Sequence, residues 1–180
     1  MSICETMLYE CHGHIFLDGA DFAAARLRHA GGVDVSAVKA ALGALRDAGV
    51  GYFRDGGDAL GVSAAAAQIA PDYGIDYATP AFAIHKKGRY GSIVGKSYET
   101  AADYRALVAE AKAAGGGFIK LMLSGIITFA RYGELSCPGL EADEICKLVN
   151  IAHGEGLCVM AHVNGADTVR AAIAAGVDSI

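Results

Sequence analysis

Residues 9–14, YECHGH, close the first apolar segment of the chain, and the choice of fold begins with them. Side chains on a strand point alternately to opposite faces, so His12 and His14 are expected to point the same way, with Glu10 beside them. Two imidazoles on one strand face can bind one metal ion. Taken alone, the pair is also compatible with two partly exposed polar residues at a strand end. Evidence for a metal site therefore has to come from other parts of the sequence.

Strand-like and helical segments alternate along the rest of the chain. The expected strands cover residues 8–16, 50–54, 75–84, 118–123 and 157–163, and another begins near residue 177. Apolar residues at three- and four-residue spacing predict helices around residues 38–45, 62–70, 104–111, 145–152 and 169–173. Such alternation predicts an α/β fold of parallel strands joined by crossover helices.

Two architectures fit this alternation: an open doubly wound sheet and a closed (β/α)8 TIM-type barrel of about 250 residues. The length of 180 residues favours the open sheet. The motifs favour the barrel, with only about its first five and a half β-α units present. The sequence therefore predicts that residues 1–180 form a single barrel domain that is incomplete at its C-terminal end.

Two further polar residues interrupt apolar strands. Lys120 stands alone in FIKLML, residues 118–123. Lysine is rarely buried without a partner, and burial lowers its pKa and frees the amine to react, for example with carbon dioxide to form a carbamate. His162 lies near the end of the strand predicted at residues 157–163. The alternatives are a lysine that reaches solvent and a core histidine bonded to a backbone carbonyl.

The polar residues share one position, the C-terminal end of a strand in a β-α unit. In a barrel, that end of the strands carries the active site. The side chains of His12, His14, Lys120 and His162 are therefore expected to converge as metal ligands. Nitrogen donors with a carboxylate-like bridge suit zinc, with manganese, iron or nickel as alternatives.

Five stretches, taken together in their order and spacing, are far more specific than the histidine pair. They are residues 10–14, 51–57 (GYFRDGG), 117–125 (GFIKLMLSG), 161–165 and 176–180. In these stretches the chain resembles the metal-dependent amidohydrolase superfamily, and within it the imidazolonepropionase-like and prolidase-like branch. The resemblance extends over nearly the whole chain.

The resemblance implies roles for the four residues. His12 and His14 match the first-strand ligands of one metal, Lys120 matches the fourth-strand lysine that is carbamylated in members with two metals, and His162 matches the ligand of the second metal. It implies a hydrolase that uses metal-activated water to cleave a C–N bond in an amide, cyclic amide or dipeptide-like substrate. The expected cofactor is one or two zinc ions or a similar divalent metal.

The chain also departs from the family pattern. Members usually have an aspartate where Glu10 stands, and the branch often has a histidine where Asn164 stands. The sixth-strand histidine and the eighth-strand aspartate, the usual proton shuttle, are expected beyond Ile180. Many members begin with a β-sandwich segment, and residues 1–8 are too short to supply one, so none is expected in this chain. These departures predict that no catalytic acid or base is present and that the 180 residues are inactive alone.

Residues 84–91 form a basic loop after the third expected strand. His85, Arg89 and Tyr90 are candidates for substrate binding, because arginine suits a carboxylate and such loops determine specificity. A solvated basic loop is the alternative. Arg54 and Asp55 are expected to form a local pair at the end of the second strand.

The composition limits which classes of partner and which cellular compartment are expected for the chain. Fifteen lysines and arginines against 20 aspartates and glutamates give a net charge of −5, which argues against a nucleic-acid partner. No apolar run is long enough to span a membrane and no secretory signal is visible. Five cysteines without a CxxC pair indicate buried thiols and a reducing cytoplasm. A small-molecule substrate and a homo-oligomer are expected.

Two other functions remain open at this stage. One is a non-catalytic scaffold or small-ligand-binding remnant of the same fold, which the missing ligands would favour. The other is an unrelated α/β sugar or phosphate enzyme that uses Lys120 as a Schiff-base residue. The order of His12, His14, Lys120 and His162 favours the metal-dependent hydrolase.

Overall fold

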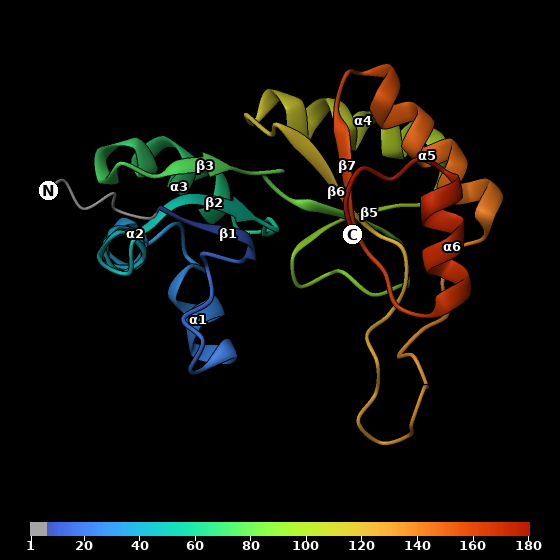
Figure 1. The fold of residues 1–180 in the computed structure, drawn as a ribbon, viewed down its shortest axis with the longest axis horizontal. Helices are drawn as coiled ribbons and strands as arrows, with labels where there is room; N and C mark the ends of the chain where they lie inside the picture. The colour runs from blue at the N-terminus through green and yellow to red at the C-terminus, as the bar shows by residue number, and fades with distance from the viewer. Residues whose placement is uncertain (1–6) are drawn as a thin grey trace, which may run out of the picture.

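Seven parallel strands form two sheets in the computed structural model, which describes residues 7–180 (Figure 1). The first sheet has the order β1-β2-β3 and the second has the order β5-β4-β6-β7. The strands are β1 (Leu8–Gly13), β2 (Val50–Asp55), β3 (Asp76–Ala78), β4 (Ala83–Lys86), β5 (Gly95–Tyr98), β6 (Phe118–Met122) and β7 (Cys158–His162). The sheets do not close into a barrel within the described residues.

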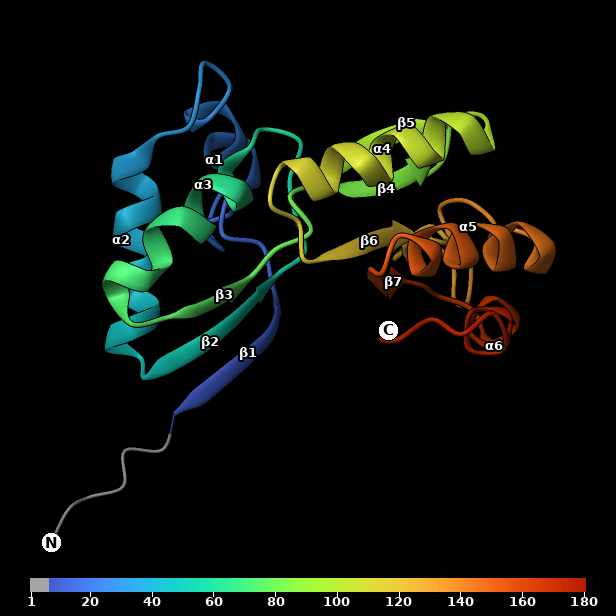
Figure 2. The ribbon, with the colours of Figure 1, turned by 90° about the horizontal axis from the view of Figure 1, so that it is seen from above.

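Helices cover the outer side of both sheets (Figure 2). They are α1 (Phe22–Arg28), α2 (Val35–Asp47), α3 (Val62–Ile69), α4 (Ala101–Ala113), α5 (Ala142–Gly154) and α6 (Ala166–Ala174), with a 3-10 turn, η1 (Ala70–Tyr73), after α3. In Figure 2, α2 and α5 lie at opposite ends of the molecule, with the strands between them. The fold is therefore a parallel α/β arrangement. The helices lie on the outer faces of the two sheets, and no helix of the described residues covers their inner faces.

Strand β6 shows how the two faces of a sheet differ. Ile119 and Leu121 belong to the hydrophobic core that β6 forms with α4 and α5. Lys120 and Met122 alternate with them and point to the other face, which carries the polar residues. The period of two therefore separates the core from the candidate site.

Side-chain caps fix where two of the helices begin. The Asp34 carboxylate accepts the backbone N–H groups of Ser36 and Ala37 at the start of α2. Thr100 and Asp103 form a reciprocal capping box at the start of α4. Such caps satisfy N–H groups that have no partner inside the helix.

The strand predicted at residues 75–84 is broken in two, and that prediction was wrong. Pro80 has no N–H to give to a sheet, and Ala81 has a φ of 63°, outside the strand region. The Thr79 hydroxyl accepts the Ala81 N–H at 2.9 Å and closes the turn. Because β3 ends before this turn and β4 begins after it, the break separates the two sheets.

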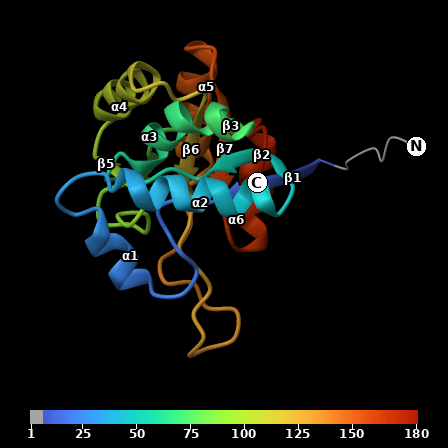
Figure 3. The same ribbon diagram turned by 90° about the vertical axis from the view of Figure 1, so that its left-hand side faces the viewer.

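The segment between β6 and α5 extends away from both sheets in Figures 1 and 3. An antiparallel bridge between Ile127 and Leu135 closes it into a hairpin-like loop. Phe129 and Tyr132, near its tip, are fully exposed. This loop therefore contributes little to the hydrophobic cores.

The cysteines differ from the prediction of buried thiols. Cys11, Cys146 and Cys158 are exposed, and Cys137 is half-buried; all four are free. Cys4 lies outside the described residues. No helix in residues 7–180 has the length and apolar character needed to cross a membrane.

Candidate active site

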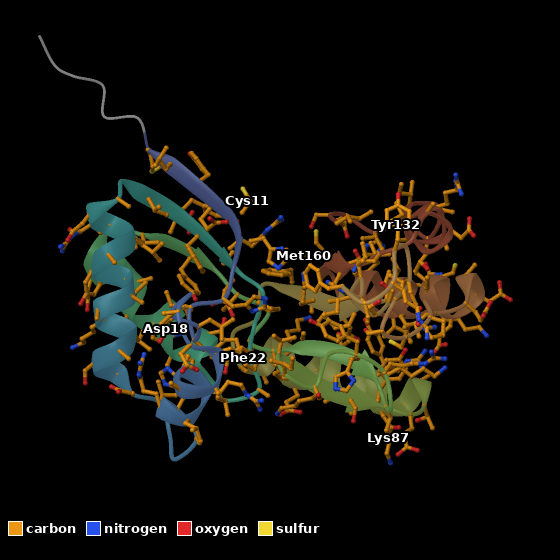
Figure 4. The ribbon with its side chains drawn as sticks, turned by 90° about the horizontal axis from the view of Figure 1, so that it is seen from below. Cys11, Asp18, Phe22, Lys87, Tyr132 and Met160 are labelled. Carbon is orange, nitrogen blue, oxygen red and sulfur yellow. The ribbon has the colours of Figure 1, made fainter. Side chains whose placement is uncertain are left out.

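His12 and Lys120 meet across the two sheets. His12 lies on β1 and Lys120 on β6, 108 positions later, yet the Nε2 atom of His12 is 3.4 Å from the Nζ atom of Lys120. Lys120 is only 2% exposed. Figure 4 shows Cys11, next to His12, and Met160, the strand partner of Lys120, toward the junction between the sheets. The polar inner side of both sheets therefore forms one site.

A bulge in β1 decides which side chains reach this site. Glu10 pairs with Phe53 and Gly13 pairs with Asp55, so one extra residue of β1 lies between these two pairs. Phe53 belongs to the hydrophobic core under the helices. Glu10 therefore shares the face of Phe53 rather than that of His12, and its expected place beside the histidines was wrong. Its carboxylate instead accepts the His12 backbone N–H at 3.0 Å.

His14 lies just after β1, because the strand ends at Gly13 instead of continuing to residue 16. Its ring centroid is 5.6 Å from that of His12. Its Nδ1 atom is 2.9 Å from the carbonyl oxygen of Gly57, which can only accept, so Nδ1 carries the proton. A Cβ on Gly56 would come within 2.4 Å of the His14 ring, so the glycine leaves room for the imidazole.

His162 shares the inner face of the second sheet with Lys120. Residues in register on parallel strands point to the same face, and here Met122 pairs with His85 on β4 and with His162 on β7. Met122, His85 and His162 therefore form a row across the second sheet, two residues further toward the C-terminal end of the strands than Lys120. The Nε2 atom of His162 is 3.2 Å from the Asn164 amide nitrogen. His162 therefore lies at the C-terminal end of its strand, as His12 and His14 do for β1, with Lys120 nearer the middle of β6.

Burial and neighbouring positive charges lower the pKa of three nitrogen-bearing side chains of the site: His12, Lys120 and His162. Burial, followed by the charges of Lys120 and His14, lowers the pKa of His12 to about 4. Burial, followed by the charge of Arg54, lowers the pKa of Lys120 to about 8. Burial and the charge of Lys120 also lower the pKa of His162. Neutral imidazoles are the form that binds metal, and a neutral amine is the form that reacts as a nucleophile.

The donor set suits a metal but is incomplete in the described residues. No group of three histidine, cysteine, aspartate or glutamate side chains in residues 7–180 is close enough together to hold a metal ion. His12 and His14 supply two nitrogen donors, and the Gly57 carbonyl orients the His14 ring as outer-shell partners of metal-binding histidines do. Lys120 would add a donor only as a neutral amine or a carbamate. The residues present therefore fit part of a metal site.

Of the three substrate-binding candidates, Tyr90 packs against the predicted metal ligand His162. Its ring centroid is 5.2 Å from that of His162, and burial raises the pKa of its hydroxyl. His85 is buried, with its Nδ1 atom 3.0 Å from the Lys86 carbonyl oxygen. The guanidinium of Arg89 donates to the carbonyl of Pro138 at 3.4 Å, on the protruding loop. Their role in binding substrate stays a prediction.

Arg54 and Asp55 do not pair, contrary to expectation. They point to opposite faces of β2: the Arg54 Nε–H donates to the Cys11 carbonyl at 2.8 Å on the inner side, while Asp55 is buried under the helices. Arg54 also donates to the Ser179 hydroxyl at 3.4 Å. Arg54 therefore joins the first sheet to the chain that follows β7, a contact that sequence spacing could not reveal.

A cavity of about 530 Å³ lies beside β1, between α1 and α2. Its walls are mostly apolar, and Glu10 and His14 border it. Many of the wall residues are alanines of α2, and Arg28 and Asp18, which form an ion pair at 3.4 Å, also border it. His14 therefore lies between this cavity and the inner side of the sheets, where His12 is its neighbour.

Comparison with known proteins was made at the level of both sequence and structure. Neither a protein-family model nor a curated protein matches the chain. Solved structures do match: an amidohydrolase has a TM-score of 0.67 at 20% identity, with coverage of 95% of this chain and 46% of that protein. The A. niger ochratoxinase has a TM-score of 0.69 at 19% identity, with coverage of 95% and 45%. A Xaa-Pro dipeptidase with bound methionine has a TM-score of 0.70 at 18% identity, with coverage of 97% and 47%.

The chain has the amidohydrolase fold. This confirms, for the fold, the resemblance seen in the sequence and the predicted class of a partial TIM-type barrel. The chain spans less than half the length of these three proteins. What those proteins do as a whole enters below only as support for a proposal.

Proposed function

We propose that the chain is part of a metal-dependent hydrolase that cleaves a C–N bond in an amide, cyclic amide or dipeptide-like substrate. The observation that carries the proposal is the 3.4 Å approach of the His12 and Lys120 nitrogens across the two sheets. The structural neighbours, which include a Xaa-Pro dipeptidase and an ochratoxinase, support the same class of reaction. The substrate within this class follows from neither observation.

His12 and His14 would hold one divalent metal, with zinc as the first candidate and manganese, iron or nickel as alternatives. Lys120, as a carbamate, and His162 would take part in holding a second metal. A bound divalent metal would lower the pKa of water and polarise the carbonyl of the substrate. The protein's own residues prepare this site, because burial and neighbouring charges favour the neutral form of His12, Lys120 and His162.

Carbamylation of Lys120 is consistent with its surroundings. The neutral amine would add to the carbon of carbon dioxide, forming an N–C bond and releasing one proton. Counted from the protonated lysine, which first gives up a proton to become the neutral amine, two protons are released and the side chain changes from a cation into an anion. Because no carboxylate in residues 7–180 forms an ion pair with Lys120 or Arg54, an anion here would neutralise charge that is otherwise unpaired.

Binding of zinc tests the proposal directly. We expect the purified chain to bind one or two equivalents of zinc, measured by elemental analysis after dialysis, and the double variant His12→Ala plus His14→Ala to lose them. His153→Ala is the matched control, because His153 lies on α5 and forms an ion pair with Asp178 at 2.9 Å, away from the site. Zinc retained by the double variant, or no zinc in a version of the chain extended past Ile180, would contradict the proposal.

A Schiff-base role for Lys120 is the second candidate function. The observation in its favour is the buried amine with a pKa lowered to about 8, which makes it a nucleophile near neutral pH. Borohydride would trap a carbonyl substrate on Lys120 if this reading is correct. A chain that binds no zinc and traps no carbonyl compound would favour the scaffold reading.

A further inference from the structure

Asp55, the last residue of β2, is a fully buried carboxylate that the proposed chemistry does not use. Burying a charge is costly unless the charge is paired or hydrogen-bonded, and burial raises the pKa of Asp55. No lysine, arginine or histidine forms an ion pair with it in the described part of the chain. Hydrogen bonds therefore have to stabilise this buried carboxylate in place of an ion pair.

Three donors converge on the Asp55 carboxylate. Oδ1 accepts the backbone N–H of Gly57 at 2.6 Å. Oδ2 accepts the backbone N–H of Ile15 at 3.2 Å and also the hydroxyl of Tyr77. Ile15 directly follows His14, and Gly57 carries the carbonyl that accepts from the His14 ring. One carboxylate therefore holds both backbone segments that fix His14.

The two backbone segments are also joined directly. The Gly56 N–H donates to the Gly13 carbonyl at 2.7 Å. Gly57 has a φ of 82°, and a Cβ there would come within 2.9 Å of the Phe82 backbone. The turn after β2 can therefore approach the turn after β1 closely enough for the His14 ring to lie against Gly56.

We propose that Asp55 is a positioning residue for His14. By holding the amides of Ile15 and Gly57, it keeps the Gly57 carbonyl in line with Nδ1 of the ring. The proton then stays on Nδ1, and Nε2 keeps its lone pair for a metal. The inference rests on the proposed function, because it gives a purpose to the orientation of a candidate ligand.

The test compares two buried aspartates that accept hydrogen bonds from different backbone segments. Asp55→Asn keeps the shape of the side chain but places an NH2 group opposite one of the three donors. Asp58→Asn is the matched control. Asp58 is 1% exposed and accepts the backbone N–H groups of Leu60, Val62 and Ser63 at the start of α3, with no bond to the turn that carries His14. Both variants lose hydrogen bonds to a buried carboxylate.

The first readout is the tautomer of His14 in the metal-free chain, measured by ring nitrogen-15 NMR at about pH 8.5. The unaltered chain and Asp58→Asn are expected to show His14 protonated on Nδ1 alone. Asp55→Asn is expected to show a mixture of the two tautomers. A spectrum of Asp55→Asn with the single Nδ1 tautomer would overturn the inference, whatever the change in stability.

The second readout is zinc affinity, measured by competition with a chelating dye. Loss of an outer-shell partner typically weakens metal binding about 10- to 100-fold, and this is expected for Asp55→Asn but not for Asp58→Asn. If zinc leaves the His12 and His14 resonances of the unaltered chain unchanged, the proposed function fails. The tautomer measurement still decides the role of Asp55 in that case.

A third variant covers the case in which Asp55→Asn does not fold. Tyr77→Phe removes the hydroxyl that holds Oδ2, and Asp55 keeps its two backbone bonds. A smaller population of the second His14 tautomer is expected than in Asp55→Asn. An unchanged His14 spectrum in Tyr77→Phe, with Asp55→Asn unfolded, would overturn the inference.

Discussion

Lys120 is buried without an acidic partner among the described residues, and this has a measurable effect on stability. Its pKa is about 8 in the folded chain and 10.5 as an ordinary value. Between these pH values the unfolded chain binds a proton that the folded chain does not. The free energy of unfolding of the metal-free chain should therefore contain a contribution that increases from pH 8 to pH 10.5, by up to about 3 kcal/mol.

Lys120→Met should remove this contribution, because it replaces the amine with an apolar side chain of similar length. Urea unfolding at about pH 7.5 and pH 10 is the measurement. The variant should gain stability relative to the unaltered chain at the lower pH and less at the higher one. Lys112→Met, at an exposed lysine of α4, is the control. Equal differences at both pH values would show that Lys120 does not titrate in this range.

At the scale of residues, the sequence predicted that His12 and Lys120 would meet, but not which face some other side chains occupy. Alternation along a strand brings His12 to the inner side, and burial of Lys120 follows from its apolar neighbours. The same alternation misplaces Glu10, because one extra residue in β1 shifts the faces and leaves no mark in the composition. Arg54 and Asp55 are adjacent, so pairing was a natural expectation, yet neighbours on a strand point apart.

At the scale of elements, α2 offers a substitution that should increase stability. Gly43 lies in the middle of α2, and a Cβ there would be 3.7 Å from the Tyr73 ring, an ordinary contact. Glycine in a helix interior is less favourable than alanine, so Gly43→Ala should increase the free energy of unfolding by about 0.5–1 kcal/mol. Thermal unfolding measures this. A lower melting temperature would mean that Tyr73 cannot accommodate the methyl group.

Elements with helical periodicity or a clear apolar run were predicted from the sequence, and α1 and β5 were not. The helices α2, α4 and α5 each have 13 residues, with apolar side chains at helical spacing. Strand β5 has only four residues, GKSY, and no apolar run. The turn at residues 79–82 was missed although Pro80, which cannot donate to a sheet, marks it in the sequence, whereas the positive φ of Ala81 has no side-chain signal of its own.

At the scale of the whole molecule, the free edge of β1 is expected to drive self-association. Strand β1 is the last strand of its sheet, and Leu8 is 50% exposed. Unpaired strands with exposed apolar residues recruit other chains, whereas lysine at an edge discourages this. Sedimentation velocity should show concentration-dependent association of the chain and less of it in Leu8→Lys. A chain that is monomeric at all concentrations would contradict this prediction.

The alternation of strand and helix was enough to predict the fold class, because it requires parallel strands. The division into two sheets was not predicted, because the turn that separates them, at Pro80 and Ala81, was taken as part of one strand. The meeting of His12 with Lys120 was predicted only by combining separate motifs with the barrel geometry. No local pattern relates two residues 108 positions apart.

The break at residues 79–82 also bears on how cooperatively the molecule unfolds. The buried residues of one hydrophobic core all precede the break, with Ile93 and Val94 packed against them, and those of the other run from Ala81 onward, with Ala64 of α3 packed against them. Halves with separate cores can open separately, at different free energies. His12 belongs to one half and Lys120 to the other, so opening of the weaker half alone would separate them. A ligand held by both residues would stabilise only the state in which both halves are folded. The unfolding transitions of the two halves would then occur together.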